Sequence, residues 1–315
     1  MHLKSFEFLV DRLPFGFAFN FGNYLFNKIK HINSQGIDER ADYFIINHVK
    51  KRIEGKIHFL LEDGKAYSPF KSLFGSFEFN PRIHPNILLD FWLFIENDLR
   101  SRQIELVKIT NFANCYSPQK ATLILNTLES CGFEIVLKAV NHHINVNENP
   151  LEKRMHTMEI RRLNKCRQAG FSFRQEKKEN ALEIYNFLNL CRQERDLRLS
   201  ITKDKFLNYL DEFPQNYHCF SVRSENELLA ASITIQVHRK ILYSFLPGSL
   251  RKFKEFSPAV MLNEGLYMYC QQHQIDMLDL GISTEKNGKD QKSLISFKER
   301  IGGEKSYKYF FEKKL

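Results

Sequence analysis

The residues best suited to chemistry include a basic loop and the start of the helix that follows it. Arg251, Lys252 and Lys254 lie close together and precede Ser257-Pro258. Serine at the start of a helix can accept a backbone N–H, and proline has its φ preset for the first helical position. Because the N-terminus of a helix attracts anions, these residues form a candidate contact for a negatively charged ligand.

Two more candidates follow. Asp279 stands near the end of an apolar run, where its carboxylate can orient a loop or accept a proton; a structural turn carboxylate is an equally good interpretation. Lys298 lies beside Lys292 and Arg300 in a short basic segment. On the residues alone, an exposed helix lysine is the better interpretation of Lys298.

The sequence lacks the motifs of several other enzyme classes. It contains no Ser-His-Asp order, HExxH, phosphate-binding Walker loop or GxGxxG. The six cysteines include no CxxC and no close pairing with histidine, so we expect reduced core thiols. His142 and His143 are adjacent and point apart on a strand, and we expect a solvated linker there. The sequence therefore predicts neither a metal nor a redox cofactor.

A helix, a strand, a loop and a second helix must position these candidates. Apolar residues recur at helical spacing from 259 to 269, directly after Pro258. The mostly apolar run 275–280 before Gly281 is short enough for a buried strand. This order predicts an α/β unit.

This part of the sequence resembles the C-terminal acyltransferase half of the Fem family, the enzymes that add amino acids to peptidoglycan precursors, and of related GNAT-fold acyltransferases. The resemblance rests on the strand ending in DLG at 279–281, the pair Phe297-Lys298 and the turn GGE at 302–304, which occur in the family's order and spacing. It covers roughly residues 150 to 310.

The resemblance implies an N-acyltransferase. Such an enzyme holds the donor's phosphates, accommodates the acyl group, polarises its carbonyl oxygen and removes a proton from the amine. The family's Phe-Lys lysine lies near the reacting ester, which makes Lys298 the best candidate for stabilising the carbonyl or a phosphate, with Asp279 as a second catalytic candidate. The helix that opens at Ser257 corresponds to the phosphate cradle.

A basic helix from 155 to 169 also has a counterpart in Fem relatives, where a similar helix introduces the catalytic half. Arg161, Arg162 and Lys165 make this helix strongly basic, and Gly170 ends it. Contact with a phosphate and a solvated helix face are equally open interpretations of these three cations.

The donor loop differs from that of acetyl-CoA enzymes with the same fold. Those enzymes carry a Gln/Arg-x-x-Gly-x-Gly/Ala loop, whereas the segment 251–256 contains no glycine. The cations Arg251, Lys252 and Lys254 would therefore have to bind the donor phosphates. Fem-type enzymes, which use aminoacyl-tRNA, have a similarly glycine-free loop. We expect aminoacyl-tRNA or acyl-CoA as the donor substrate and no permanently bound cofactor.

An internal repeat supports the same architecture. A shift of 171 positions places Asn86 on Ser257, both expected N-caps, and sets Gln-Ile-Glu-Leu at 103–106 on Gln-Ile-Asp-Met at 274–277. Matching caps, helix lengths and strand entries in one register are typical of a duplicated unit. We expect an α/β fold with a mixed sheet, formed by two tandem GNAT-like domains, as in Fem-family proteins.

The polar segment 141–150 marks the expected junction of these domains. We expect a degenerate N-terminal GNAT-like domain in residues 1–145 and the acyltransferase domain in residues 146–315. Within the first domain, residues 42–52 look helical. The alternating phenylalanines between 15 and 21 favour a half-buried strand over a surface for membrane or partner contact.

The charge balance favours anionic partners. The chain has 46 basic and 37 acidic residues, a formal net charge of +9 and a pI near 9.1. Phosphates, nucleic acid and a charged membrane surface all suit this excess, as does a solvated surface without a ligand. We find no signal peptide and no apolar run long enough to span a bilayer, so we expect a cytoplasmic protein without stable membrane insertion.

Two functions fit these observations. The leading hypothesis is an acyl- or aminoacyl-transferase that moves an activated acyl group from aminoacyl-tRNA or acyl-CoA to an amine of a small acceptor or a cell-envelope precursor. The alternative is a catalytically inactive protein of the same fold that binds tRNA or another anionic partner, which the glycine-free loop motivates. The sequence leaves the oligomeric state open.

Overall fold

The chain forms two compact units. The computed structural model describes residues 6–36, 39–225, 227–285 and 287–315 of the 315. The first unit consists of the chain up to Val140 together with residues 284–289 and 306–315. The second unit consists of residues 141–283 and 290–305. Residues 306–315 therefore lie in the first unit, whereas the sequence placed them in a domain of residues 146–315.

The second unit contains a mixed sheet. Its order is β8, β13, β12, β11, β10, β9, and all neighbours are antiparallel except β12 and β13, which are parallel. The strands are β8 (Glu134–Asn145), β9 (Ser172–Glu176), β10 (Tyr217–Arg223), β11 (Leu228–His238), β12 (Ile241–Ser249) and β13 (Met277–Ile282). Of β8, residues 141–145 belong to this unit.

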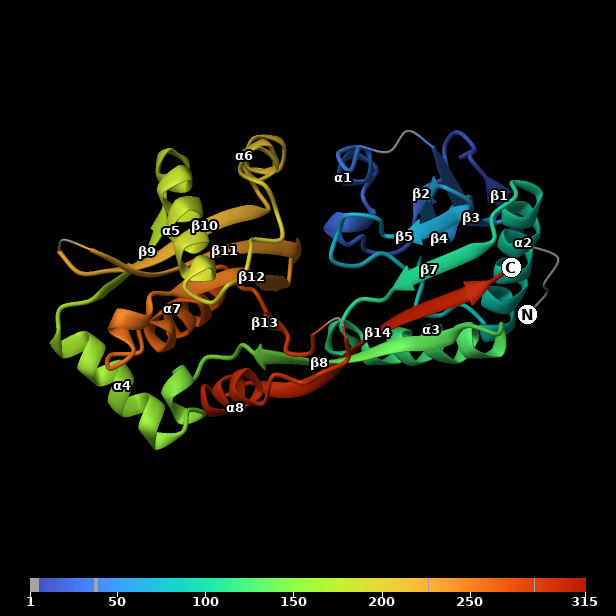
Figure 1. Ribbon diagram of the computed structural model, residues 1–315. Coiled ribbons are helices and arrows are strands. Elements are labelled where there is room, and N and C mark those ends of the chain that lie inside the picture. The colour runs from blue at the N-terminus through green and yellow to red at the C-terminus, as the bar shows by residue number, and fades with distance from the viewer. Residues whose placement is uncertain (1–5, 37–38, 226, 286) are drawn as a thin grey trace. The chain divides into compact units, whose positions relative to one another are not determined.

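Helices cover both faces of this sheet. Figure 1 shows α5 (Ala181–Gln193) and α6 (Lys203–Glu212) over one face, and α4 (Thr157–Gln168) and α7 (Pro258–Gln272) over the other. A further helix, α8 (Lys292–Arg300), follows β13. The helix α7 packs Leu262, Leu266 and Cys270 into a core that also contains Leu242 of β12 and Leu278 of β13. A helix that is apolar around most of its surface is typical of such a central position.

Gly265 lets α7 approach strand β9 closely. A Cβ at this position would lie 2.2 Å from Cγ of Phe173. We therefore expect Gly265→Ala to destabilise the protein by about 1–3 kcal/mol through overpacking, although alanine favours a helix over glycine by about 1 kcal/mol. Urea denaturation measures the change. Phe173→Ala should cost less in the Gly265→Ala background than in the wild type, and simple additivity would contradict this explanation.

The first unit contains the other strands of the same mixed sheet. Their order is β1, β3, β4, β5, β7, β14, β8; β5 and β7 pair in parallel, and the short strands β2 and β6 pair with β4. The strands are β1 (Phe6–Val10), β2 (Ala18–Phe19), β3 (Arg40–Asn47), β4 (Arg52–Glu62), β5 (Lys65–Ser68), β6 (Glu78–Phe79), β7 (Leu106–Thr110) and β14 (Glu304–Lys314). The helices are α1 (Ile29–Asn33), α2 (Pro85–Ser101) and α3 (Pro118–Ser130).

The predicted repeat has the same turn geometry in both units. After α2 and after α7, a glutamine adopts a positive φ, 61° at Gln103 and 54° at Gln274. The next backbone N–H closes the helix end on the carbonyl five residues earlier, at 3.0 Å from Ile104 and 2.9 Å from Ile275. Each turn then leads into a strand that runs parallel to the preceding hairpin strand. The same short sequence therefore forms the same helix-to-strand connection twice.

Several local predictions for the first unit are wrong. Residues 42–52 form the end of β3, a turn and the start of β4 rather than a helix, because Tyr43 to Ile46 are β-branched or aromatic residues buried in the sheet. The strand expected over phenylalanines 15–21 is limited to Ala18–Phe19. The helix α2 begins two residues earlier than predicted, at Pro85, and His84 rather than Asn86 is its N-cap.

Two predictions near the candidate site also need correction. Ser257 occupies the N-cap position of α7, but it has φ 55° and ψ 59°, and its side chain makes no capping hydrogen bond. His142 and His143 do not lie in a solvated linker: both are buried in β8, which continues to Asn145 because it pairs with β13. By contrast, Thr202 caps α6 through its side chain, which accepts a hydrogen bond from the Lys205 N–H.

Candidate functional site

The parallel strands β12 and β13 separate after three residue pairs, from Ile241–Met277 to Tyr243–Asp279. A bulge follows directly in β12: Ser244 and Leu246 pair with consecutive residues of β11, which leaves Phe245 as the extra residue. A bulge bends its strand and increases the local twist. The two strands consequently diverge, and a cavity of about 510 Å³ lies where they part.

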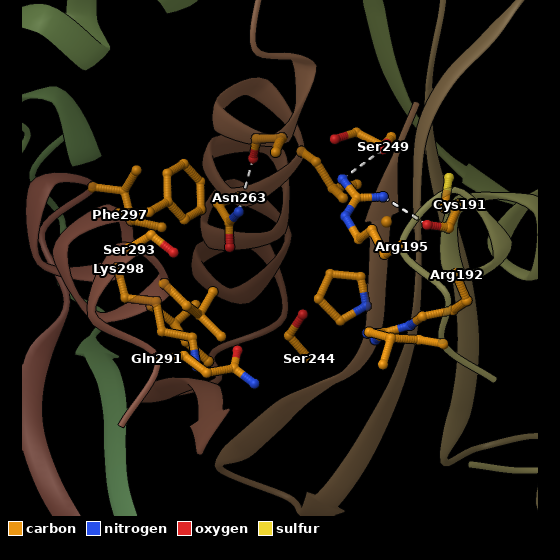
Figure 2. Close-up of a pocket in the computed structure, with 18 residues that line it drawn as sticks. Cys191, Arg192, Arg195, Ser244, Ser249, Asn263, Gln291, Ser293, Phe297 and Lys298 are labelled. Atoms are coloured by element: carbon orange, nitrogen blue, oxygen red, sulfur yellow. Dashed lines mark hydrogen bonds between the residues drawn. The ribbon is translucent and has the colours of Figure 1, made fainter. Parts of the chain in front are cut away.

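The cavity reaches both faces of the sheet. Its lining includes residues of α5 on one face, of α7 on the other, and of α8. Figure 2 shows Lys298 and Gln291 on one side of the cavity and Arg192 and Arg195 on the other. The apolar part of the lining includes Ala259, Leu262, Leu280, Leu294, Phe297 and Ile301. An apolar chamber with a few polar groups at its ends is typical of a small-molecule site.

Lys298 is the buried cation of this cavity. Its side chain is only 6% exposed, and its Nζ donates hydrogen bonds to the carbonyl oxygens of Gly281 at 2.7 Å and Ile282 at 3.1 Å, and to the hydroxyl of Ser283 at 2.9 Å. Burial lowers the pKa of Lys298 to about 7, although the nearby Asp279 carboxylate acts in the opposite direction. Lys298 is therefore buried, and is not the exposed helix lysine that its charged neighbours indicated.

Asp279 shapes the turn that holds Lys298. Its buried Oδ1 accepts hydrogen bonds from the Gly281 N–H at 2.8 Å and from the Asn141 side chain at 3.0 Å. Gly281 has φ 75°, and a Cβ there would lie 2.9 Å from the Tyr243 hydroxyl. Only glycine fits this turn without strain. Asp279 is not among the residues that line the cavity; it contacts the Gly281 turn, whose carbonyl accepts a hydrogen bond from Lys298.

The burial of Lys298 predicts a pH dependence of stability. An unfolded lysine has a pKa of about 10.4, whereas that of folded Lys298 is about 7. The unfolded chain binds more protons between these values, so the contribution of Lys298 to the free energy of unfolding rises with pH from about 7 to about 10. We expect the stability of the wild type relative to Lys298→Met, measured by urea denaturation, to rise across this window. A difference independent of pH would contradict the assignment.

Two arginines of α5 and the segment after it lie at the other side of the cavity. The Arg195 guanidinium donates to the carbonyls of Cys191 at 2.6 Å and Ser249 at 3.2 Å, and so ties the end of α5 to β12. Arg192 forms no ion pair within the part of the chain that the structure describes, and burial lowers its pKa, with Arg195 adding to the effect. An incompletely neutralised pair of guanidinium groups favours an anionic group of a ligand in this part of the cavity.

The predicted phosphate-binding residues lie elsewhere. Ser257, Arg251, Lys252 and Lys254 do not line the cavity. The Arg251 N–H donates to the Glu194 carboxylate at 3.0 Å, and Lys252 forms an ion pair with Glu227 at 2.5 Å. The N–H groups of residues 253, 254, 256 and 257 donate to carbonyls within this loop. The loop therefore offers an anion few free backbone donors. Arg251, Lys252 and Lys254 are all exposed, and of these three cations only Lys252 forms an ion pair within the described residues.

The predicted basic helix α4 is also separate from the cavity. Arg162 lies 2.9 Å from the buried Glu159 carboxylate, which Arg300 of α8 also contacts at 2.8 Å. Lys165 forms an ion pair with Glu255. Arg161 is exposed. Structural ion pairs thus account for Arg162 and Lys165, and among these three cations Arg161 faces solvent.

Sequence reasoning missed several residues that line the cavity. Arg192, Arg195, Asn263, Gln291 and Ser293 belong to none of the motifs found in the sequence. The cavity brings them together because β12 bulges and parts from β13, a feature with no sequence signature here. Only the apolar run before Gly281 and the pair Phe297-Lys298 could have directed attention to this place.

Comparisons with known proteins agree with this architecture. Residues 153–299 match the family model described as an acetyltransferase (GNAT) domain. A search of curated protein sequences finds no match to this chain.

Three solved structures have a similar fold. The crystal structure of FemX is 13% identical, covers 93% of each chain and has a TM-score of 0.71. The C-terminal domain of a putative lysylphosphatidylglycerol synthetase from Agrobacterium fabrum is 12% identical, covers 82% of this chain and 81% of its own, and has a TM-score of 0.56. A tandem GNAT protein from the clavulanic acid biosynthesis pathway is 12% identical, covers 88% and 83%, and has a TM-score of 0.53. At these identities the matches establish the fold.

Proposed function

We propose that this chain, which has the GNAT fold in two successive units, is an acyl- or aminoacyl-transferase whose second unit transfers an activated acyl group to an amine. The observation that carries the proposal is the cavity at the divergence of β12 and β13, with the buried Lys298 in its wall. A carbonyl group bound there is accessible from both faces of the sheet, so a donor and an amine acceptor can approach it from opposite sides.

The chemistry requires a nucleophilic amine to attack the carbonyl carbon of the donor. A tetrahedral oxyanion forms, the amine loses a proton, and the donor's hydroxyl or thiol leaves with a proton. A fixed cation that lies beside the oxyanion lowers the barrier, commonly by a factor of about 10²–10³ for one donor group. We assign this role to Lys298. Of the three hydrogen bonds that its Nζ donates, a ligand oxygen can most readily replace the one to the Ser283 hydroxyl.

The pKa of Lys298 adds a second capacity. Because burial lowers it to about 7, both protonation states are populated near neutral pH. When Lys298 starts neutral, it can receive the amine proton, become the cation beside the oxyanion, and return the proton to the leaving group. Asp279 contributes through Lys298, since its carboxylate fixes the Gly281 turn whose carbonyl accepts from the Nζ.

Aminoacyl-tRNA is the donor that we favour. The loop before α7 uses its N–H groups internally and on Glu194, which leaves little backbone to close on a pyrophosphate. Exposed cations such as Arg251 and Lys254, with Arg161, suit the phosphates of a polynucleotide instead. The acceptor amine belongs to a small molecule or a cell-envelope precursor, as the resemblance to the Fem family implies. Acyl-CoA is the second donor to test.

We assign the acyl transfer to the second unit because the corresponding place in the first is filled. Beyond the ends of β5 and β7, the Gly75 N–H donates to the Thr110 carbonyl at 3.0 Å. The ring of Phe74, only 2% exposed, packs there against those of Phe112 and Tyr116, with centroids 6.3 Å and 5.7 Å away. This packing supports a first unit that is degenerate as a catalyst.

The test is transfer of a labelled acyl group by the purified chain. A charged tRNA pool and a set of labelled acyl-CoA thioesters are offered in parallel with amine acceptors, including amine-bearing peptidoglycan precursors, and label in the acceptor is measured. Transfer from charged tRNA supports the proposal as stated. Transfer from acyl-CoA alone would show that acyl-CoA, and not aminoacyl-tRNA, is the donor. Tight, salt-dependent tRNA binding without transfer from either donor would contradict it and favour the binding-protein alternative.

A further inference from the structure

The phenylalanine-rich segment near the N-terminus is not used by the proposed reaction. Phe17 and Phe21 pack against a small core of Phe44, Ile46 and Ile53, so the segment is anchored on the sheet of the first unit. Phe15 lies between these anchors and the preceding strand, and its side chain is 104% exposed. Alternation in the sequence therefore does not reflect a half-buried strand here: it leaves one large aromatic ring entirely in water.

A second exposed segment adjoins it. The Ala18 N–H donates to the Lys51 carbonyl at 3.4 Å, and the rings of Phe17 and His48 contact each other edge to face with centroids 5.6 Å apart. The turn between β3 and β4 is therefore next to the phenylalanine-rich segment. At this turn Val49 is 81% exposed. We call Leu13, Phe15 and Val49 the apolar tip; Leu13 is 47% exposed.

Cations accompany the apolar tip. Arg12, Lys50, Lys51 and Arg52 are all exposed, and within the described part of the chain none of their side chains forms an ion pair. The nearest acidic side chains in sequence are already engaged: Glu7 with His48, Asp11 with Arg102, and Glu54 with the amides of Asn20 and Asn80. The surface around the tip therefore combines projecting apolar groups with uncompensated positive charge.

We infer that this part of the first unit docks on an anionic membrane surface. An aromatic ring and aliphatic side chains that project from a basic surface can enter the headgroup region while the cations contact lipid phosphates. An RNA backbone offers no comparable partner for Val49 and Leu13. No helix of the described chain is long and apolar enough to cross a membrane.

A polar cavity beside the tip suits a lipid headgroup. It measures about 470 Å³ and is lined by Lys50, Arg52 and Arg82, together with asparagines and the buried Glu54. Glu54 Oε2 accepts from the Asn20 and Asn80 amides at 2.9 Å and 2.7 Å. Lys50 and Arg52 belong both to this cavity and to the basic surface around the tip. They would therefore hold a lipid phosphate at the mouth of the cavity when the tip enters the bilayer.

Co-sedimentation of the full chain with vesicles tests the inference. Vesicles of phosphatidylcholine alone are compared with vesicles that also contain phosphatidylglycerol. We expect binding only to the anionic vesicles, and weaker binding at high salt. The variant Phe15→Ser/Val49→Ser should bind at least about tenfold more weakly, since each apolar side chain loses its burial. Lys50→Gln/Lys51→Gln should lose about fivefold per lysine.

Matched controls separate docking from general effects. Leu93→Ser removes an exposed apolar residue of α2, and Lys203→Gln an exposed cation of α6; both should bind like the wild type. Equal vesicle binding by the tip variants and the wild type would overturn the inference. A change of oligomeric state in the tip variants would also overturn it. So would displacement of vesicles from the tip by tRNA, if that displacement requires Lys50 and Lys51 but not Phe15. Lys298→Met should retain vesicle binding, so failure of docking and failure of catalysis are distinguishable.

Discussion

Lys298→Met is expected to lower kcat of acyl transfer by at least about 10²-fold, with donor binding changed much less. The size follows from the loss of one fixed donor to a developing oxyanion. Methionine keeps most of the side-chain volume in the buried position, so the fold should persist. Single-turnover transfer from saturating donor measures the effect, and a separate filter-binding titration measures donor affinity.

Lys292→Met is the matched control for this variant. Lys292 lies on the same helix α8, but it is exposed and does not line the cavity. We expect the control to retain wild-type turnover. If Lys298→Met also retains it, Lys298 has no catalytic role, and the oxyanion must be stabilised by another group of the cavity. A parallel loss of donor binding and turnover would instead indicate that Lys298 contacts the bound donor equally in the ground state.

Ser293→Trp is expected to reduce kcat/KM for the donor at least about tenfold. Ser293 lies in the first turn of α8, is exposed, and is one of the residues that line the cavity (Figure 2). An indole at this position occupies volume that the acyl group needs, and discrimination by pocket shape commonly amounts to about 1–3 kcal/mol. Surface substitutions of this kind usually change stability by about 0.5 kcal/mol or less.

Lys292→Trp tests whether the effect comes from the cavity. It introduces the same indole one residue earlier on α8, outside the cavity lining. We expect nearly unchanged kcat/KM and a similar midpoint of urea denaturation for both tryptophan variants. Equal activity of Ser293→Trp and the wild type would show that the acyl group does not enter this cavity.

The fold was predictable where the signal is local. The strands 217–223 and 228–238 coincide with apolar runs bounded by polar turns, which is a local pattern. The repeat of Gln-Ile after each helix identified two related units, and the predicted α/β fold with two tandem GNAT-like domains is confirmed. Pro258 marked the start of α7 for the same local reason.

The remainder depends on which strands meet. The helix predicted over 42–52 is wrong because burial between neighbouring strands decides the conformation of Tyr43 to Ile46, and their neighbours are distant in sequence. The histidines of 141–150 are buried because β8 pairs with β13, about 140 residues later. Pairing of β14 with β7 likewise joins the C-terminal residues to the first unit. No local pattern encodes such partners.

The candidate site shows the same division. The motif of Phe297-Lys298 singled out the lysine, but its charged neighbours Lys292 and Arg300 indicated an exposed helix face. The structure buries Lys298 because the Asp279-Gly281 turn presents carbonyl oxygens to its Nζ. Arg192 and Arg195 lie in the cavity because a bulge separates two strands. The roles of the predicted residues stay predictions until activity is measured.

A structure of the chain with a stable donor mimic tests the central claim most directly. A suitable mimic is an aminoacyl group joined through an amide to 3′-amino-3′-deoxyadenosine, which cannot be transferred. We predict electron density for the aminoacyl carbonyl between β12 and β13, with its oxygen towards Lys298. Density for the mimic in the first unit or on the surface, with this cavity unchanged, would contradict the account.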